Sequence, residues 1–574
     1  MVDAITTEII RHAMLAAADE IARNLCRTAY NTVVYEIHDY GIGLHDENGD
    51  VVADTPGVAV FTRGNDIGVK NAIKFLGKES MEPGDVFIIN YPYWSSAHAL
   101  DPLVFAPIHV GERLIGFSTC RVHVTDLNQK DPGYVLDSTH LSQEGLMMPA
   151  SKLYRRGERN EDVFNIIKFN SRRPRHTIGD IQSQVSAVVT GVRRMKELAD
   201  KYGADTVVDA MKAINEHGER LSRLALEKLP KGTWSTVDYI DEDGVDVGKL
   251  IKLKCTVTIT DEEMIIDWTG SANDVQGPLN VPPGLTEAAA CLIFKSITTP
   301  DSPVVAGNFA PLRVITEEGS VMHAVPPMST FTMWTGILSG ETILKALAQA
   351  MPETIPASSG GDVCAFIGLG GNPRTGEPWQ DGSNEAVGYG ATSTQDGEDG
   401  IMHISEPGCR NTPVEVFEMR TPLFLEHYGY RQDSSGAGQF RGGVGISRAY
   451  RYTAPGVGIM LSYKTRTRPW GIRGGLEGVP NAVILNPGTE NEKWQGPSYN
   501  HLEAGEVLVN ATGGGGGYGD PLKRDFDAIS ADVRNEFLTP EAVKRDYKVI
   551  IDKDGVIDHE ATAELRDSYK AQNA

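Results

Sequence analysis

Apolar residues near the start of the chain recur at a helical period. Within residues 7–29 they are separated by three or four positions, and aspartate and glutamate occupy several of the positions between them. This spacing predicts an amphipathic helix that packs on the sheet following it. The apolar positions are Ile10, Met14, Ala17, Ile21 and Leu25.

From residue 30 to about residue 153 the pattern changes to short apolar runs separated by glycine, proline and aspartate. Runs of this kind predict β-strands. Within residues 41–53, the pair Asn48 and Gly49 separates two such runs, and this dipeptide favours a β-hairpin. The other segments expected to be extended are 32–35, 86–89 and 114–120.

Two later stretches have a helical pattern again, residues 161–169 and residues 180–229. Gly203 lies where the second stretch divides, and Pro230 ends it. Because proline cannot continue a helix and glycine commonly terminates one, we expect a helical hairpin here.

The remainder of the chain alternates between strand and loop patterns. Residues 232–325 have strand character, and 252–260 alternate as a half-buried strand does. Residues 302–385 predict long loops with one helix near 338–351. Residues 414–509 predict β-hairpins rich in glycine and aromatic side chains.

These patterns predict an α+β protein, a multi-sheet mixed α/β architecture with a helical hairpin and a glycine-rich β C-terminal region. We find no internal boundary within residues 1–525. Residues 526–574 are expected to form a helical C-terminal tail that packs on a neighbouring subunit.

The chain is acidic, with a formal net charge of -23 over 574 residues. This charge argues against nucleic-acid binding, because the acidic residues outnumber the basic ones, 77 to 54, and binding a phosphate backbone requires an excess of cations to replace its counterions. No apolar run is long enough to span a bilayer, and the first residues lack the basic region of a secretory signal. The six cysteines form no Cys-x-x-Cys pair, so we expect reduced thiols and a cytoplasmic location.

Candidate metal ligands are concentrated in the first quarter of the chain. His98 and Asp101 lie three residues apart, so one turn can direct both side chains to the same point. His123 follows the expected strand 114–120, and Asp39 follows the short extended segment before it. Two imidazoles with carboxylates suit zinc, manganese or ferrous iron, and the absence of thiolate ligands argues against a purely structural zinc site.

The same residues also have a structural interpretation. Histidine can satisfy hydrogen bonds inside a core, and aspartate often caps loops. Spacing alone therefore leaves a metal site and a structural role both open.

A run of five glycines occupies residues 513–517. Consecutive glycines can let backbone amides approach a phosphate, but no Lys-Ser or Lys-Thr follows, as a P-loop requires. We therefore expect no nucleotide site in this chain, and we expect the glycines to let the backbone pass close to other structure.

Segments along nearly the whole chain resemble the hydantoinase B, 5-oxoprolinase and acetone carboxylase superfamily. Its members usually carry an Asn-Asp-Pro-Tyr segment, a His-x-x-Asp pair and a His-His-Ala-Asp-Val-Gly-Gly segment, which correspond here to residues 90–93, 98–101 and 123–129. The further matching segments, in chain order, are 143–146, 169–172, 179–181, 267–271, 277–280, 411–415, 436–443 and 513–521.

The resemblance implies that His98, Asp101 and His123 bind a divalent metal, with Asp39 as a fourth ligand. Three positions depart from the family pattern: Tyr91 replaces an aspartate, Val124 replaces the second histidine, and 128–129 replaces the closing Gly-Gly. None of these departures removes an implied ligand, but they leave the substrate open.

Three carboxylates are candidate catalytic residues. We expect Asp101 to act both as a metal ligand and as a general base. Asp126 is expected either to orient His123 or to take a proton itself. Glu144 is expected to line the pocket or, equally, to cap a loop.

The resemblance further implies a hetero-oligomer in which a hydantoinase A-type partner binds ATP with magnesium. Residues 1–525 would then be a hydantoinase B-like catalytic region. The predicted reaction is hydrolysis of a small cyclic amide of the hydantoin, lactam or oxoproline type. The partner would phosphorylate the amide oxygen, and metal-activated water would attack the phosphorylated substrate.

Two alternatives stay open. The chain could serve a ketone carboxylase of the acetone or acetophenone type, because that reaction also needs ATP activation followed by chemistry at a metal. It could instead be a non-catalytic scaffold subunit with a degenerate site, an alternative to which the departures at Tyr91, Val124 and Asn128 give weight.

Overall fold

The computed structural model describes residues 2–55 and 57–573, and within them the chain forms helices and four β-sheets. This architecture confirms the predicted α+β class. The chain divides into two compact units. Unit 1 comprises Met1–Asp238, Glu242–Ile343 and Ile404–Thr412, and unit 2 comprises Tyr239–Asp241, Leu344–His403 and Pro413–Ala574.

The main sheet of unit 1 has seven strands in the order β2-β1-β5-β4-β3-β6-β7, and all neighbouring pairs are antiparallel. The expected hairpin around Asn48 is confirmed as β1 and β2. The strands are β1 (Tyr40–Asp46), β2 (Val51–Thr55), β3 (Val86–Ile89), β4 (Leu103–Val110), β5 (Arg113–Val122), β6 (Ser151–Arg155) and β7 (Glu158–Arg159).

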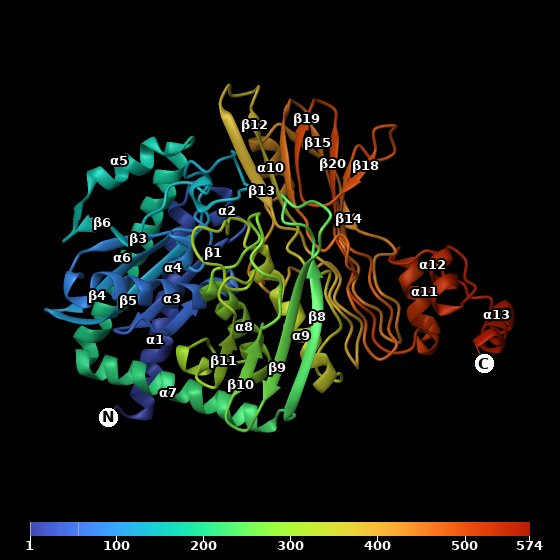
Figure 1. Cartoon of the computed structure of the whole chain (residues 1–574), viewed down its shortest axis with the longest axis horizontal. Helices are drawn as coiled ribbons and strands as arrows, with labels where there is room; N and C mark the ends of the chain where they lie inside the picture. The colour runs from blue at the N-terminus through green and yellow to red at the C-terminus, as the bar shows by residue number, and fades with distance from the viewer. Residues whose placement is uncertain (1, 56, 574) are drawn as a thin grey trace. The chain divides into compact units, whose positions relative to one another are not determined.

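Helices flank this sheet, as the blue and cyan part of Figure 1 shows: α6 contacts β4 and β5, and α3 contacts β1 and α8. The predicted helical hairpin is confirmed as α6 and α7, which are divided at Gly203. The helices of unit 1 are α1 (Ala4–Thr28), α2 (Thr32–Tyr35), α3 (Ala59–Leu76), α4 (Pro92–Ser95), α5 (Glu161–Phe169), α6 (Pro174–Tyr202), α7 (Ala204–Lys228) and α8 (Pro283–Thr298), with short 3-10 turns η1 (Lys78–Ser80), η2 (Leu141–Gln143) and η3 (Ala306–Phe309).

The opening helix α1 is confirmed, and it begins three residues earlier than the predicted residue 7. Asp3 caps it by accepting a hydrogen bond from the Thr6 backbone N–H at 3.0 Å. Such a cap satisfies an amide that would otherwise lack a partner. The apolar face is buried as expected, at Ile10, Met14, Ala17, Ile21 and Leu25.

A second sheet of unit 1 has the order β11-β10-β9-β8, in which β10 pairs in parallel with β11 and antiparallel with β9. Strand β9 alternates buried and more exposed residues, which confirms the expected half-buried strand. The strands are β8 (Gly232–Ile240), β9 (Ile251–Ile259), β10 (Met264–Asp267) and β11 (Leu312–Ile315).

Several expectations were wrong. Residues 32–35 form the short helix α2 rather than an extended segment, because the Asn31 side chain accepts a hydrogen bond from the Val33 N–H and caps it. Helix α8 lies in a region expected to hold strands, and most of its residues are buried, so it lacks the polar face that identifies a helix. Strands β12 and β13 lie in a region expected to be loops, whereas β11 lies within residues 232–325, where strands were expected.

Unit 2 has two sheets, in the orders β13-β12-β16-β19 and β14-β15-β20-β17-β18. Their aromatic core contains Phe366 and Tyr450, whose stacked rings lie 3.9 Å apart. The elements are α9 (Trp334–Ala350), at the boundary of the units, β12 (Ala365–Gly371), β13 (Pro378–Ser383), α10 (Val414–Arg420), β14 (Leu423–Tyr430), β15 (Ile446–Tyr452), β16 (Gly456–Leu461), β17 (Ala482–Leu485), β18 (Lys493–Gln495), β19 (Ser498–Leu502) and β20 (Val507–Ala511).

The glycine run lies in a layer of unit 2 where backbones approach closely. A Cβ atom added at Gly515 would lie 1.9 Å from the Tyr389 carbonyl oxygen, and one at Gly516 would lie 2.0 Å from the Trp470 carbonyl oxygen. Gly516 N–H donates to the Ser358 carbonyl at 2.8 Å. The expectation that these glycines permit close backbone approach is therefore confirmed.

The predicted C-terminal helices are present and pack on unit 2 of the same chain. Apolar residues of the tail form a cluster with Ala437, and Arg524 donates to Asp396 and Asp532 at 2.7 Å each. The elements are η4 (Pro521–Lys523), α11 (Phe526–Arg534), α12 (Pro540–Tyr547) and α13 (His559–Asn573).

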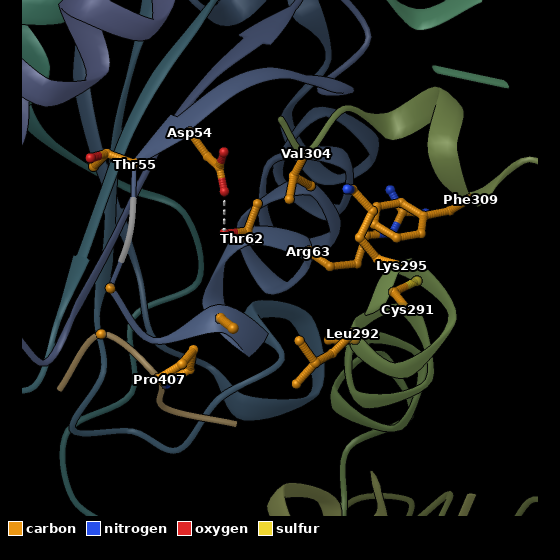
Figure 2. A pocket seen from close by; sticks show the side chains of 14 residues that line it. Asp54, Thr55, Thr62, Arg63, Cys291, Leu292, Lys295, Val304, Phe309 and Pro407 are labelled. Atoms are coloured by element: carbon orange, nitrogen blue, oxygen red, sulfur yellow. Dashed lines mark hydrogen bonds between the residues drawn. The ribbon is translucent and has the colours of Figure 1, made fainter. Parts of the chain in front are cut away.

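Three further features bear on function. A pocket of unit 1 is bordered by β2, α3 and α8 (Figure 2). Over the residues described, no helix combines the length and apolar character needed to cross a membrane. In the same residues no disulfide joins any of the six cysteines.

Candidate metal centre

Three neighbouring strands of the main sheet bring the candidate ligands to one edge. Tyr40 of β1 and Leu103 of β4 pair with the last two residues of β5, Val122 and Arg121 respectively. Asp39 directly precedes β1, His98 and Asp101 precede β4, and His123 directly follows β5. The sequence suggested that Asp39 follows a strand, but in the structure it precedes one.

Local hydrogen bonds fix the backbone of this edge. The Asp101 N–H donates to the His98 carbonyl at 3.0 Å, which closes the expected turn between them. The Val124 N–H donates to the Leu100 carbonyl at 2.8 Å, and the His123 N–H donates to the Asp39 carbonyl at 3.4 Å. The three ligand-bearing segments are thus joined directly to one another.

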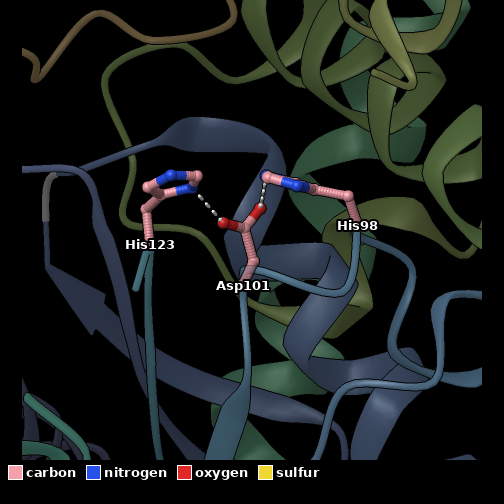
Figure 3. A group of neighbouring side chains, drawn as sticks. All are labelled: His98, Asp101 and His123. Atoms are coloured by element: carbon pink, nitrogen blue, oxygen red, sulfur yellow. Dashed lines mark hydrogen bonds and ion pairs between the residues drawn. The ribbon is translucent and has the colours of Figure 1, made fainter. Parts of the chain in front are cut away.

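The side chains of His98, Asp101 and His123 form a compact group, here called the histidine triad. Asp101 lies between the two rings in Figure 3: its Oδ2 is 3.0 Å from His98 Nε2, and its Oδ1 is 3.0 Å from His123 Nδ1. One donor atom from each residue lies within 4.8 Å of the others. All three residues are buried.

Burial and mutual contact set the charges of the triad. Burial lowers the pKa of His98 below its usual value, although Asp101 opposes this shift. Burial also disfavours charge on His123, but hydrogen bonding to Asp101 and the nearby carboxylates outweigh it and raise its pKa. Burial acts against ionisation of Asp101, but the two histidines outweigh it and lower its pKa. The Asp101 carboxylate is therefore anionic at neutral pH.

The triad fits a divalent metal by its chemistry. Two imidazoles and a carboxylate form the donor set that zinc, manganese and iron accept in proteins. Within residues 2–55 and 57–573, the buried His98 Nδ1 has no hydrogen-bond partner. A buried polar atom without a partner is costly in a purely structural site, so this arrangement can hold a metal.

Asp39 lies beside the triad and outside the group of donors within 4.8 Å. Burial, together with the negative charges of Asp101 and Glu406, raises its pKa well above the usual value, while His123 opposes the shift. Glu406 is buried and also acts on the charge of His123. Sequence reasoning missed Glu406, because it lies far along the chain and belongs to none of the recognised motifs.

Asp126 contacts a different partner from the one expected. Its Oδ1 accepts a hydrogen bond from Arg172 Nη1 at 2.6 Å, and its Oδ2 accepts one from the Arg172 backbone N–H. The carboxylate that contacts His123 is that of Asp101. Asp126 therefore joins the segment that follows His123 to the segment of residues 169–172.

Glu144 is completely buried and caps a loop. It accepts hydrogen bonds from Ser329 Oγ at 2.7 Å and from the Thr330 N–H at 2.6 Å. Burial raises its pKa to about 7. Phe331, which follows Thr330 in the chain, packs edge-on against His98 and Tyr134, with ring centroids 5.5 Å and 4.9 Å apart respectively. Glu144 thus holds the segment that covers the triad with an aromatic ring.

Further residues of the recognised motifs hold the backbone of the site. Asn90 Nδ2 donates to the Ala99 carbonyl at 2.8 Å, within the turn that carries His98. Asp180 accepts hydrogen bonds from the N–H groups of Tyr30 and Asn31 and so anchors the segment leading to Asp39. The sequence signal that pointed to Asn90 and Asp180 was their position in the family motifs. Their hydrogen bonds to backbone groups give them a structural role beside the triad.

The departures from the family pattern leave the triad intact. Val124 is fully buried beside His123. Tyr91 precedes helix α4 and packs against Trp94 with ring centroids 5.3 Å apart. Gln129 is buried, and its Oε1 accepts a hydrogen bond from the Leu127 N–H at 3.0 Å. These side chains pack around the site or contact backbone.

The structure thus defines an α+β protein with a buried His–Asp–His group that can hold a metal. The family model described as hydantoinase B/oxoprolinase matches residues 3–521, and the chain belongs to this family.

Relatives extend over most of the chain. An uncharacterised protein of Methanocaldococcus jannaschii is 31% identical, and the match covers 98% of this chain and 100% of the relative. The caprolactamase subunit beta of Pseudomonas jessenii is 28% identical, with 98% of each covered. The 5-oxoprolinase 1 of Arabidopsis thaliana is 28% identical, and the match covers 91% of this chain but 42% of that protein.

Solved structures share the fold. The crystal structure of the ATP-dependent caprolactamase from Pseudomonas jessenii superposes with a TM-score of 0.92 at 26% identity and covers 99% of this chain and 100% of its own. The nucleotide-free structure of an acetone carboxylase superposes with a TM-score of 0.91 at 18% identity, covering 100% of this chain and 83% of its own. The second likeness concerns the fold alone.

Proposed function

We propose that this chain is the metal-binding subunit of an ATP-dependent enzyme that hydrolyses a small cyclic amide of the hydantoin, lactam or oxoproline type. The observation that carries the proposal is the buried histidine triad in a chain of the hydantoinase B/oxoprolinase family. End-to-end similarity to a caprolactamase subunit supports the amide class.

His98, Asp101 and His123 would hold the metal, and Asp39 would complete the set or accept a proton beside it. When bound, a divalent zinc, manganese or iron ion supplies a Lewis acid and lowers the pKa of water. Asp101 contacts both imidazoles and so orients them. Phe331 and Tyr134 pack beside His98 and would limit the access of solvent to the site.

We assign the proton acceptor to Asp39 rather than to Asp101. Asp101 is engaged by both histidines, whereas Asp39 lies in the field of His123 without belonging to the compact group. Asp126 is engaged by Arg172, and Glu144 by Ser329 and Thr330. Those two carboxylates would act by holding the loops around the site.

The match lengths support a separate ATP-binding partner. This chain corresponds end to end to a protein named as a subunit, but to less than half of the Arabidopsis 5-oxoprolinase. The remainder of that longer protein has no counterpart here. We propose that a separate hydantoinase A-type subunit supplies the corresponding part. This subunit would bind ATP with magnesium and form a hetero-oligomer with the present chain.

The test is ATP-dependent turnover by the chain co-purified with such a partner. Hydantoin, caprolactam and 5-oxoproline are offered as substrates, and ring opening is followed together with ADP release. We expect ring opening of at least one substrate, and a loss of at least about a hundredfold in the complex carrying His98→Ala.

The matched control is His45→Ala, because His45 is also a buried histidine beside an aspartate of the same unit. ATP-dependent consumption of acetone with bicarbonate, without ring opening, would favour the ketone carboxylase instead. Ring opening unaffected by His98→Ala in an intact complex would favour the scaffold role.

A further inference from the structure

The pocket of unit 1 that Figure 2 shows combines apolar walls with one carboxylate that has no ion-pair partner among the described residues. It has a volume of about 230 Å³ and lies between β2, helices α3 and α8 and the loop around Pro407. Pockets for small ligands are commonly apolar with a few polar groups that orient the ligand. The apolar lining includes Ala59, Ala288, Leu292, Val304 and Phe309.

The labelled side chains of the pocket fall into two groups. In Figure 2, Asp54 and Thr62 lie together on one side, and Lys295, Cys291 and Phe309 lie together on the other. Thr62 Oγ1 donates to Asp54 Oδ2 at 3.1 Å.

The cations of the pocket are already engaged elsewhere. Arg63 donates to Asp66 at 2.6 Å and to Glu287 at 2.9 Å. Lys295 Nζ donates to the Ser302 carbonyl at 2.7 Å and also to the Thr299 carbonyl. Asp54 forms no ion pair within 4.0 Å with either of them. Within residues 2–55 and 57–573, the Asp54 charge is therefore left without a directly contacting cation.

Burial raises the pKa of Asp54 to about 6, so the carboxylate is ionised at neutral pH in surroundings that disfavour its charge. A cation placed beside it would relieve that cost, since charge-assisted hydrogen bonds are stronger than neutral ones. The apolar walls opposite can accept a hydrocarbon chain. A cavity of about 150 Å³ already admits a benzene-sized molecule, so this pocket has room for a short alkyl chain.

We propose that this pocket binds a small primary ammonium compound with an apolar chain, its ammonium group on Asp54 and its chain against α8. The ligand chemistry has two sources: a simple alkylamine, or the amino acid released when a lactam ring opens. The second source rests on the proposed function, and the first does not.

Isothermal titration of the full chain tests the proposal with three probes. Hexylamine carries the ammonium and the chain, 1-hexanol lacks the charge, and 6-aminohexanoate adds a carboxylate. We expect hexylamine to bind at least about tenfold more tightly than 1-hexanol, because only its charged group can pair with Asp54.

Two variants locate the binding site. Asp54→Asn keeps the shape of the side chain and is expected to weaken hexylamine binding by about tenfold or more, with little effect on 1-hexanol. Leu292→Trp fills the pocket and is expected to abolish binding of both probes. The control is Asp50→Asn, because Asp50 pairs with Lys70 outside this pocket and should leave binding unchanged.

Hexylamine binding that is absent, or that is the same in Asp54→Asn and Leu292→Trp as in the wild type, would overturn the proposal. Binding of 6-aminohexanoate at least as tight as that of hexylamine would identify the ring-opened amino acid as the ligand class, and weaker binding would identify the simple amine. Metal content and ring opening are measured on the same variants. Their retention in Asp54→Asn separates this result from the fate of the proposed function.

Discussion

Two buried histidine–aspartate groups lie in unit 1 and differ in how their polar atoms are partnered. His45 Nδ1 lies 3.0 Å from Asp66, its Nε2 lies 2.9 Å from Thr119 Oγ1, and Arg63 also contacts Asp66. In the triad, His98 has Asp101 beside one ring nitrogen, and the other has no partner among the described residues.

The comparison separates a structural charge group from a site that can accept a ligand. Around His45, the protein itself supplies a neighbour to both ring nitrogens and a cation to the aspartate. In the triad, one carboxylate lies between two histidines and no lysine or arginine contacts it within 4.0 Å in the described part of the chain. Residue type and burial are shared, so the difference lies in the completeness of the partners.

The largest expected effect is on metal content. Elemental analysis of the purified chain should give about one equivalent of zinc, manganese or iron, as the donor set of one site allows. His98→Ala and Asp101→Ala should lose it, and His45→Ala should retain it. Retention of the metal in both triad variants would remove the distinction drawn between the two groups.

The next effect is on stability, and it should appear in the His45–Asp66 group rather than in the triad. Asp66→Asn leaves the buried His45 and the partly buried Arg63 without their shared anion, so we expect the free energy of unfolding to fall by about 3–5 kcal/mol. Urea denaturation followed by fluorescence measures the change. Asp50→Asn, in a half-exposed pair with Lys70, should cost less than about 1 kcal/mol. Equal losses in the two variants would contradict the structural role of Asp66.

A smaller and pH-dependent effect should appear at Glu144, which covers the triad through Phe331. Burial raises its pKa from 4.5 to about 7, so the folded state favours the neutral form. As pH rises from 4.5 to 7, Glu144 ionises in the unfolded chain but stays largely protonated in the folded protein. The wild type therefore loses up to about 3 kcal/mol of its free energy of unfolding over this range. Glu144→Gln removes this dependence. The free energy of unfolding of the variant should therefore rise relative to that of the wild type as pH rises over this range.

Thermal unfolding of both proteins at several pH values measures the difference. A constant difference across that range would show that Glu144 stays ionised in the folded protein. Metal content should be unchanged in Glu144→Gln, because its contacts are to Ser329 and Thr330 rather than to the triad.

Much of the fold could be predicted because its signals are local. The stripe of apolar residues in α1, the Asn48-Gly49 turn and the alternation in β9 each occupy one segment. Helix α2 could not be predicted from its β-branched residues, since a side-chain cap at Asn31 decides it. Helix α8 is buried on most of its surface, and burial on all sides removes the periodic signal.

The sequence predicted the residues of the candidate site but not the partners of the carboxylates around it. Spacing and family motifs brought forward His98, Asp101 and His123, and strand pairing then brought them to one edge. Asp126 contacts a residue that lies 46 positions away in the sequence, and Glu144 contacts residues that lie more than 180 positions away. Such contacts depend on tertiary packing, and no pattern in the neighbouring sequence encodes them.

The glycine layer of unit 2 has a consequence for mutational scans of this protein. Any side chain at Gly514 or Gly515 would overlap a carbonyl oxygen of a neighbouring segment. A scan would therefore score these positions as intolerant as the triad, although they carry no reactive group. Sorting the two kinds of position requires a readout of folded protein beside the readout of activity, because steric exclusion and lost chemistry look the same when only survival is counted.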